Sequence, residues 1–130
     1  MATGRVARRD SVTKGILRRL SKDKDAGVRQ GVASNVNAPG DVLAALSKDS
    51  HPAVRKAVAN NTSAPGETLT AMLAADPNLD LSIANNTSTP AATLTELAGS
   101  EYAIVVAGVA SNTSTSVDTL TGLIDHADEG

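Results

Sequence analysis

VANNTSAPGETL, residues 58–69, is the string from which the architecture of this chain can be worked out. Edited copies of it stand at 32–43 (VASNVNAPGDVL), 83–94 (IANNTSTPAATL) and 109–120 (VASNTSTSVDTL), and a degraded copy stands at 6–17 (VARRDSVTKGIL). The string contains overlapping Asn-x-Ser/Thr acceptor sequences for N-glycosylation at Asn60 and Asn61. Because it recurs at nearly fixed spacing, we interpret it as the end of one helix followed by the start of the next, and not as a sugar attachment site.

One alanine marks the same place in every copy, and successive copies lie 26, 26, 25 and 26 residues apart. These anchor alanines are Ala7, Ala33, Ala59, Ala84 and Ala110. Apolar residues stand one and five residues before each anchor, and ten and thirteen residues after it. Separations of three and four residues place side chains on one face of a helix, so each repeat is predicted to contain two short amphipathic helices.

Prolines mark the predicted helix starts. Pro52 and Pro77 open the first helix of their repeats, behind Ser50 and Asp76, which are residue types that cap a helix. The second helix is opened by Pro39, Pro65 and Pro90. Since proline disfavours helix at the residue before it, the first helix should end near the preceding asparagine, in a left-handed conformation that asparagine tolerates. These asparagines are Asn35, Asn61, Asn86 and Asn112, and the candidate caps of the second helix are Ser63, Ser88 and Ser114, or Thr89 and Thr115.

The predicted fold is therefore all-α, a short α-solenoid of about five helix–turn–helix repeats of 25–26 residues. A single unit of this size cannot bury its apolar stripe alone, so neighbouring units must stack. One Tyr and no Phe or Trp among 130 residues fit a thin core of Ala, Val, Leu and Ile. We expect one domain, residues 1–130, comprising a partial or capping repeat at 1–23, repeats at 24–49, 50–75, 76–100 and 101–127, and a tail at 128–130.

The string DSHPAVRKAVANNTSAPGETLTAML, residues 49–73, resembles the leucine-rich repeat variant (LRV) pattern: Asp-x-x-x-x-Val-Arg, then Val-Ala-x-Asn, then Pro, Leu and Leu. The resemblance extends over nearly the whole chain and is closest in residues 24–75. It implies alternating α- and 3₁₀-helices in a right-handed superhelix without strands. The Val-Arg pair occurs at residues 28–29 and 54–55 but becomes Leu-Asp at 79–80 and Val-Val at 105–106. The founding type holds an iron–sulfur centre on an N-terminal cysteine cluster, which this sequence lacks.

The composition argues against catalysis. With no cysteine there is no disulfide, thiolate metal site or cysteine nucleophile, and His51 and His126 stand without clustered partners. No nucleophile elbow, phosphate-binding loop or zinc-protease motif occurs. We expect no catalytic residue, metal or cofactor. The N-terminus has no apolar signal region and no apolar run approaches about 18 residues, so the chain is expected to be cytoplasmic and not in a membrane.

Charge divides the chain into opposite halves. Residues 1–56 hold all twelve Lys and Arg and five Asp, a formal +7, whereas residues 57–130 hold nine acidic residues and no Lys or Arg, a formal −9. The candidate surface for a polyanion or an acidic partner consists of Arg5, Arg8, Arg9, Arg18, Arg19, Arg29, Arg55 and Lys56. The alternative is structural: Arg29 and Arg55 pair with aspartates at repeat ends, namely Asp23, Asp25 or Asp49.

A second candidate surface lies in YAIVVAGVA, residues 102–110. Apolar residues replace the polar ones of earlier repeats here, and the candidate contact patch consists of Leu81, Ile104 and Val106. The alternative is that the last repeat packs more extensively against its own C-terminal helix, residues 117–127.

The sequence therefore predicts a non-enzymatic module for protein–protein interaction or scaffolding, with an unidentified protein partner. The alternative is binding of nucleic acid or another polyanion through the basic half, against which stands the lack of aromatic side chains for base stacking. Self-association is a further hypothesis, driven by the opposite end charges or by the C-terminal apolar patch.

Overall fold

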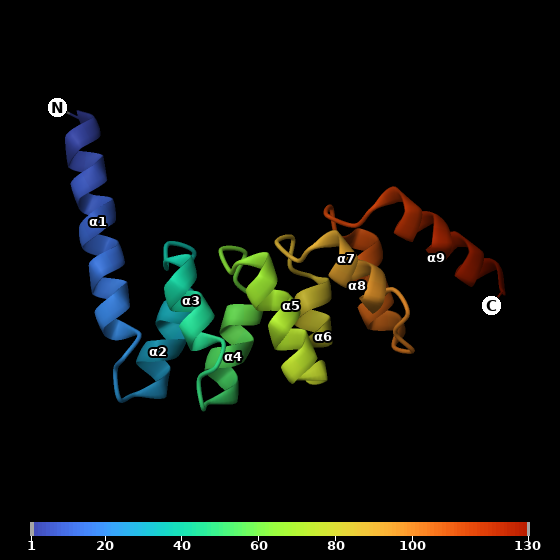
Figure 1. Ribbon diagram of the computed structural model, residues 1–130, viewed down its shortest axis with the longest axis horizontal. Coiled ribbons are helices and arrows are strands. Elements are labelled where there is room, and N and C mark those ends of the chain that lie inside the picture. Colours follow the sequence, from blue (N-terminus) through green and yellow to red (C-terminus); the bar gives the residue numbers. More distant parts are fainter. Residues whose placement is uncertain (1, 130) are drawn as a thin grey trace. The chain divides into compact units, whose positions relative to one another are not determined.

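The computed structural model describes the backbone of residues 2–129 and the side chains of residues 11–124. All regular structure in this range is helical, with no strand, as the sequence predicts. Two compact units, residues 1–65 and 66–130, divide within the predicted repeat 50–75. Each unit is built from successive helices joined by short loops (Figure 1).

Unit 1 contains four helices: α1 (Ala2–Leu20), α2 (Ala26–Ala33), α3 (Gly40–Leu46) and α4 (Pro52–Ala59). Helices α2 and α4, the first helices of two consecutive repeats, pack side by side, and α3 packs against both. The small anchor residues permit this approach, because Ala33 and Ala59 end α2 and α4 and are completely buried. Leu43, on α3, completes the core between the helices and is also fully buried.

Unit 2 contains α5 (Gly66–Ala75), the 3₁₀-helix η1 (Pro77–Leu79), α6 (Asp80–Ala84), α7 (Ala91–Leu97), α8 (Ala103–Ser111) and α9 (Val117–Glu129). Helices α6 and α8 repeat the α2–α4 arrangement. Gly108 makes their approach possible, since a Cβ there would lie 2.7 Å from the Asn85 side chain and 3.2 Å from the Ala84 Cβ.

The second helix of each repeat is α-helical and not 3₁₀, which differs from what the family resemblance implies. In α3 the N–H of Leu43 donates to the Pro39 carbonyl and the N–H of Ser47 to the Leu43 carbonyl, both four residues back. The single 3₁₀ segment among residues 2–129, η1, begins a first helix instead.

The degraded first copy forms one continuous helix, α1, and not a helix–turn–helix. The reason is visible in the sequence. Thr13 stands where later repeats have Pro39, Pro65 or Pro90, and Arg9 stands where they have asparagine. Without a proline to interrupt the backbone hydrogen bonds, the helix continues through the place of the predicted turn.

The repeat asparagines do not adopt the predicted left-handed conformation, because no described non-glycine residue has a positive φ. Asn61 and Asn112 are buried and bond to the preceding loop instead. The Asn61 Nδ2 donates to the carbonyls of Ala33 and Asn35 at 2.8 and 3.0 Å, and its Oδ1 accepts from the N–H of Ser63 at 2.8 Å. Asn112 makes the equivalent bonds in unit 2.

The loop serines and threonines also act differently from the prediction. They donate to carbonyls instead of accepting from the next helix: Ser63 to Val36, Ser114 to Thr87, and Thr89 to Ile83. Helices α3 and α7 begin after Pro39 and Pro90 with no side-chain cap. These hydroxyl groups therefore hydrogen-bond the loops to segments that precede them in the sequence.

At the first helices, one of the two predicted caps is wrong. His51, and not Ser50, caps α4, because its Nδ1 accepts from the N–H of Ala53 at 3.2 Å. The cap predicted at Asp76 is confirmed by the bond that its carboxylate accepts from the N–H of Asn78.

Candidate interaction surfaces

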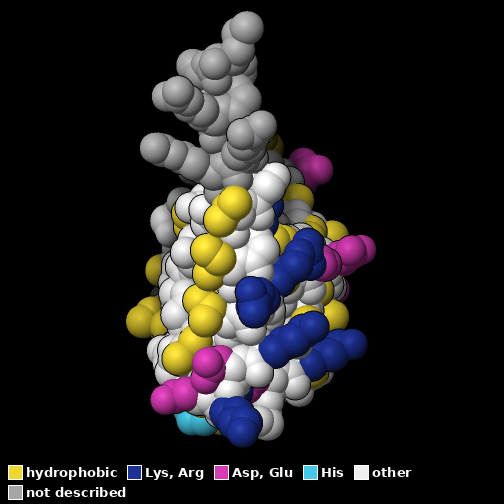
Figure 2. Space-filling view, turned by 90° about the vertical axis from the view of Figure 1, so that its left-hand side faces the viewer, with side chains coloured by type: hydrophobic (Ala, Val, Ile, Leu, Met, Phe, Trp, Pro, Cys, Tyr) yellow, Lys and Arg dark blue, Asp and Glu magenta, His cyan; other side chains and the backbone are white. Residues whose placement is uncertain are grey.

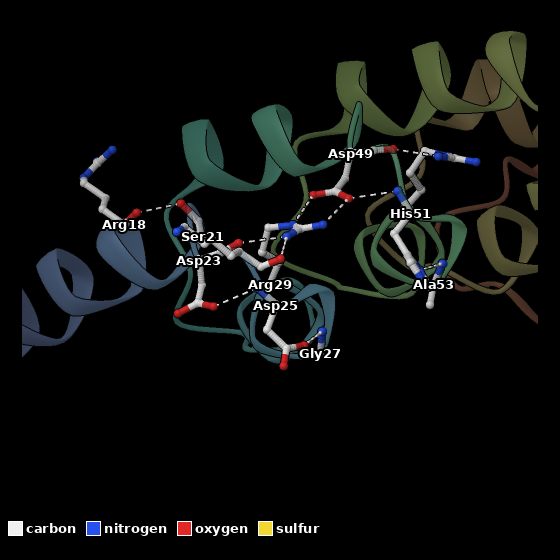
Figure 3. A network of polar contacts seen from close by, with 11 residues as sticks. Arg18, Ser21, Asp23, Asp25, Gly27, Arg29, Asp49, His51 and Ala53 are labelled. Carbon is white, nitrogen blue, oxygen red and sulfur yellow. Dashed lines mark hydrogen bonds and ion pairs between the residues drawn. The ribbon is translucent and has the colours of Figure 1, made fainter.

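Three of the predicted basic residues, Arg18, Arg29 and Arg55, form ion pairs or hydrogen bonds within unit 1 (Figure 3). The Arg29 guanidinium holds the Asp49 carboxylate through its Nε at 2.8 Å and its Nη2 at 3.2 Å. Its Nη1 donates to the carbonyls of Asp23 and Lys24. Both members of the pair are mostly buried. The structural alternative for Arg29 is therefore confirmed.

Asp49 connects two repeats. Besides the guanidinium of Arg29 in its own repeat, its carboxylate accepts the N–H of His51 in the next repeat at 2.9 Å, and its backbone carbonyl accepts the Nη1 of Arg55 at 2.6 Å. The hydrogen bond from Arg29 is the main cause that holds the pKa of the Asp49 carboxyl below its ordinary value, and the same bond raises the pKa of Arg29. Arg55 thus bonds to the backbone of Asp49 and not to its carboxylate.

The remaining predicted basic residues lie apart from this cluster. Arg18 of α1 makes a two-pronged ion pair with Asp41 at the start of α3, and this pair is exposed. Its hydrogen bond lowers the pKa of the Asp41 carboxyl. Arg19 and Lys56 are exposed. The side chains of the other three, Arg5, Arg8 and Arg9, lie outside the described residues.

Lys56 lines a polar groove of about 370 Å³ between α2 and α4. Its walls come from equivalent positions of two consecutive repeats: Gln30 and Lys56 stand three residues before their anchor alanines, and Ser34 and Asn60 stand one residue after. At these equivalent positions the walls present two amides, one hydroxyl and one ammonium group.

The predicted apolar residues of unit 2 do not gather on one side of α8. Ile104 is exposed, whereas Leu81 on α6 and Val106 are half-buried. Ile104 and Val106 are two residues apart on α8, so the directions of their side chains differ by about 200° around the helix axis. Leu81 occupies the repeat position of Lys56, a different face from that of Val106, which occupies the position of Arg29.

Unit 2 contains a larger hollow, of about 570 Å³, between α7 and α9. Small residues open it: Ala98 and Gly99 on one side and Gly122 on the other. The hydroxyls of Thr95 and Thr119, which also line the hollow, bond to each other at 2.7 Å and join the two helices.

Sequence reasoning missed six of the nine large apolar residues that are exposed in the described part of the chain, and these six lie on α1 and α9. They are Val12, Ile16 and Leu20 on α1, and Val117, Leu120 and Ile124 on α9. Viewed from the α1 end, a column of hydrophobic side chains runs beside a group of Lys and Arg side chains (Figure 2). Extending the repeat alignment to every position, and asking which residues the first and last copies leave uncovered, would have found both stripes.

Among residues 11–124, no three His, Asp or Glu side chains lie close enough to hold a metal ion. None of the described helices is both long and apolar enough to cross a membrane.

Residues 52–78 match the model of the leucine rich repeat variant family, which confirms the resemblance drawn from the sequence. No curated protein and no solved structure matches the chain.

Proposed function

We propose that this leucine-rich repeat variant protein is a non-catalytic protein-interaction module that binds an acidic segment of a partner protein along unit 1. The observation that carries the proposal is the groove between α2 and α4, whose walls repeat from one unit of the sequence to the next. Repeat proteins of this kind use such regular arrays as extended binding faces.

The charge of unit 1 selects the partner. Residues 1–65 carry twelve Lys and Arg against five Asp, a formal +7. Because Arg29 is buried in its pair with Asp49, the exposed Lys56 supplies the positive charge of the groove itself. The field of the whole unit attracts an acidic chain, while the amide and hydroxyl groups of the groove offer it hydrogen bonds.

The groove is tested by fluorescence anisotropy with a labelled glutamate-rich peptide. Lys56→Gln should weaken binding by about threefold to fivefold, the contribution of one exposed ion pair. Lys48→Gln removes the same charge from an exposed loop position of unit 1 and should leave binding nearly unchanged. Equal losses in both variants would contradict a role for the groove and leave only the general charge of the unit.

Binding of nucleic acid is the second candidate function, favoured by the same +7 charge. A labelled single-stranded oligonucleotide in the same assay decides between the two. Tighter binding of the oligonucleotide than of the peptide, with a steep loss of affinity as salt rises, would replace the acidic peptide by a nucleic acid as the partner.

A further inference from the structure

Consecutive second helices within unit 2 meet through fixed repeat positions. The hydroxyl of Thr70 on α5 bonds to that of Thr93 on α7 at 2.8 Å, and Thr95 on α7 bonds to Thr119 on α9 at 2.7 Å. The residue nine places after the anchor alanine therefore faces the preceding repeat, and the residue eleven places after it faces the following one.

At the start of the chain, the residue that should face a preceding repeat is uncovered. Ile16 stands nine places after its anchor and is 50% exposed, whereas Val42 at the same position of the next repeat is 6% exposed. Val12 and Leu20 lie one turn of α1 before and after it, so the three form a continuous apolar stripe along this helix.

On α9, a leucine whose counterparts in other repeats are buried is exposed. Leu120 is 36% exposed, whereas Leu43, Leu69 and Leu94 at the same repeat position are fully buried.

The rest of this surface of α9 completes the pattern. Val117, Leu120, Thr121 and Ile124 fall within about 100° of one another around the helix axis, opposite Thr119. The Thr121 hydroxyl donates to the Val117 carbonyl at 2.9 Å, as the Thr95 hydroxyl does to the Ala91 carbonyl. The Thr121 side chain therefore makes the same hydrogen bond as Thr95, at the equivalent position of the next repeat.

Charge makes the two uncovered faces complementary. Residues 66–130 carry nine acidic residues and no Lys or Arg, a formal −9, opposite in sign to the +7 of residues 1–65. Beside the stripes themselves, Arg19 is exposed on α1 and Asp118 is exposed on α9. Two copies of one face would repel each other, whereas one of each would attract.

We propose that the chain associates head to tail with a second copy of itself, the stripe Val12, Ile16 and Leu20 of one copy packing on the stripe Val117, Leu120 and Ile124 of the next. In this contact the first repeat of one copy follows the last repeat of another as an internal repeat follows its neighbour. In a heterologous contact of this kind, each copy uses a different stripe for each of its two neighbours. Further copies can therefore add, and the contact builds chains or rings.

The average mass measured by light scattering as a function of protein concentration tests this. The wild-type protein should grow beyond a dimer with rising concentration. Ile16→Gln and Leu120→Gln should each weaken the association by roughly tenfold, because each removes a large apolar side chain from the contact. Val36→Gln changes a more exposed apolar residue in the loop between α2 and α3 and should associate like the wild type. Unchanged circular dichroism and melting temperature would show that the variants are folded.

Mixing the two end variants distinguishes a head-to-tail contact from a symmetric one. Each variant alone keeps one intact face, so the mixture should form one-to-one dimers and nothing larger. Dimers of Leu120→Gln alone would show that α1 pairs with α1, and dimers of Ile16→Gln alone would show that α9 pairs with α9. Either result, or a wild-type protein that stays monomeric at all concentrations, would overturn the proposal.

The contact uses the ends of the chain and not the groove between α2 and α4. Lys56→Gln should therefore leave the average mass unchanged while it weakens peptide binding. Ile16→Gln and Leu120→Gln should do the reverse, so the failure of either proposal can be told from the failure of the other.

Discussion

At the scale of the residue, buried loop asparagines join consecutive repeats. Asn61 in unit 1 and Asn112 in unit 2 each donate to two carbonyls of the preceding loop and accept one N–H of their own loop. Each side chain therefore satisfies backbone groups that neither loop could satisfy alone. This explains why the Asn-x-Ser/Thr strings recur: the asparagine and the following serine both bond to the preceding loop.

Replacing Asn61 with alanine should lower the free energy of unfolding by roughly 2–3 kcal/mol, because two carbonyls and one N–H lose their partner in a buried place. Asn60→Ala is the matched control, since its side chain is exposed, and should change stability by about 0.5 kcal/mol or less. Urea unfolding of the two variants measures the difference. Equal losses would mean that the buried bonds contribute nothing specific.

Asp49 should make stability depend on pH. Since the hydrogen bond from Arg29 lowers the pKa of the folded carboxyl, the pair stabilises the fold above the unfolded pKa of about 3.9 and stops doing so as pH falls through the lower folded pKa. Asp49→Asn should be less stable than the wild type at neutral pH. The melting-temperature deficit should shrink as pH falls below about 4.

Asp41→Asn is the control for that series. The ion pair of Asp41 with Arg18 also lowers the pKa of the carboxyl, but both side chains are exposed, so solvent screens their attraction. Its deficit at neutral pH should be clearly smaller than that of Asp49→Asn. Deficits of Asp49→Asn that stay constant from neutral to acidic pH would contradict the role assigned to the carboxylate.

At the scale of the element, glycine and proline fit together between consecutive second helices. A Cβ on Gly40 would lie 3.3 Å from the Pro65 ring, and one on Gly66 would lie 3.0 Å from the Pro90 ring. Where the next repeat has serine in place of proline, the glycine position is occupied by alanine: the chain pairs Ala91 with Ser116. A proline in one repeat is therefore matched by a glycine in the repeat before it, and a serine by an alanine.

Gly66→Ala should destabilise the protein by about 1 kcal/mol through this overpacking. In a Pro90→Ser background the same change should cost close to nothing, because the serine leaves room for the added methyl group. Gly31→Ala, inside α2 with open space around it, should instead stabilise by about 0.5–1 kcal/mol. A double-mutant cycle by urea unfolding measures the coupling, and additive effects of Gly66→Ala and Pro90→Ser would contradict it.

The sequence predicted the helices and their starts well, because the spacing of apolar residues and the positions of prolines determine the local backbone conformation. The starts of α4 at Pro52 and of η1 at Pro77 follow from proline chemistry alone. What lay between repeats could not be predicted: the partners of Asn61 depend on which carbonyls the stacking brings near, 26 and 28 residues away. The continuous helix α1 could have been predicted from the sequence, because Thr13 replaces the proline that ends the first helix in other repeats.

At the scale of the whole molecule, the opposite charges of the two halves were evident from the sequence, but their meaning was not. The count of charges does not say which of them are used internally; the structure assigns Arg18 and Arg29 to aspartates of unit 1. It also leaves the stripes of α1 and α9 uncovered, which no composition could show. Charge and exposed apolar surface thus meet at the two ends of the chain.

Head-to-tail association should therefore weaken as salt rises, because the attraction between the ends acts across exposed charges that salt screens within about 8 Å at physiological ionic strength. Arg19→Gln, which removes an exposed charge three residues from Ile16, should reduce this salt dependence. Lys48→Gln removes the same charge away from the stripe and should keep the slope of the wild type. Light scattering over a sodium chloride series measures both slopes. If the two variants behave alike, the ends attract through the total charge of the units, and the side chains bordering the stripe contribute nothing of their own.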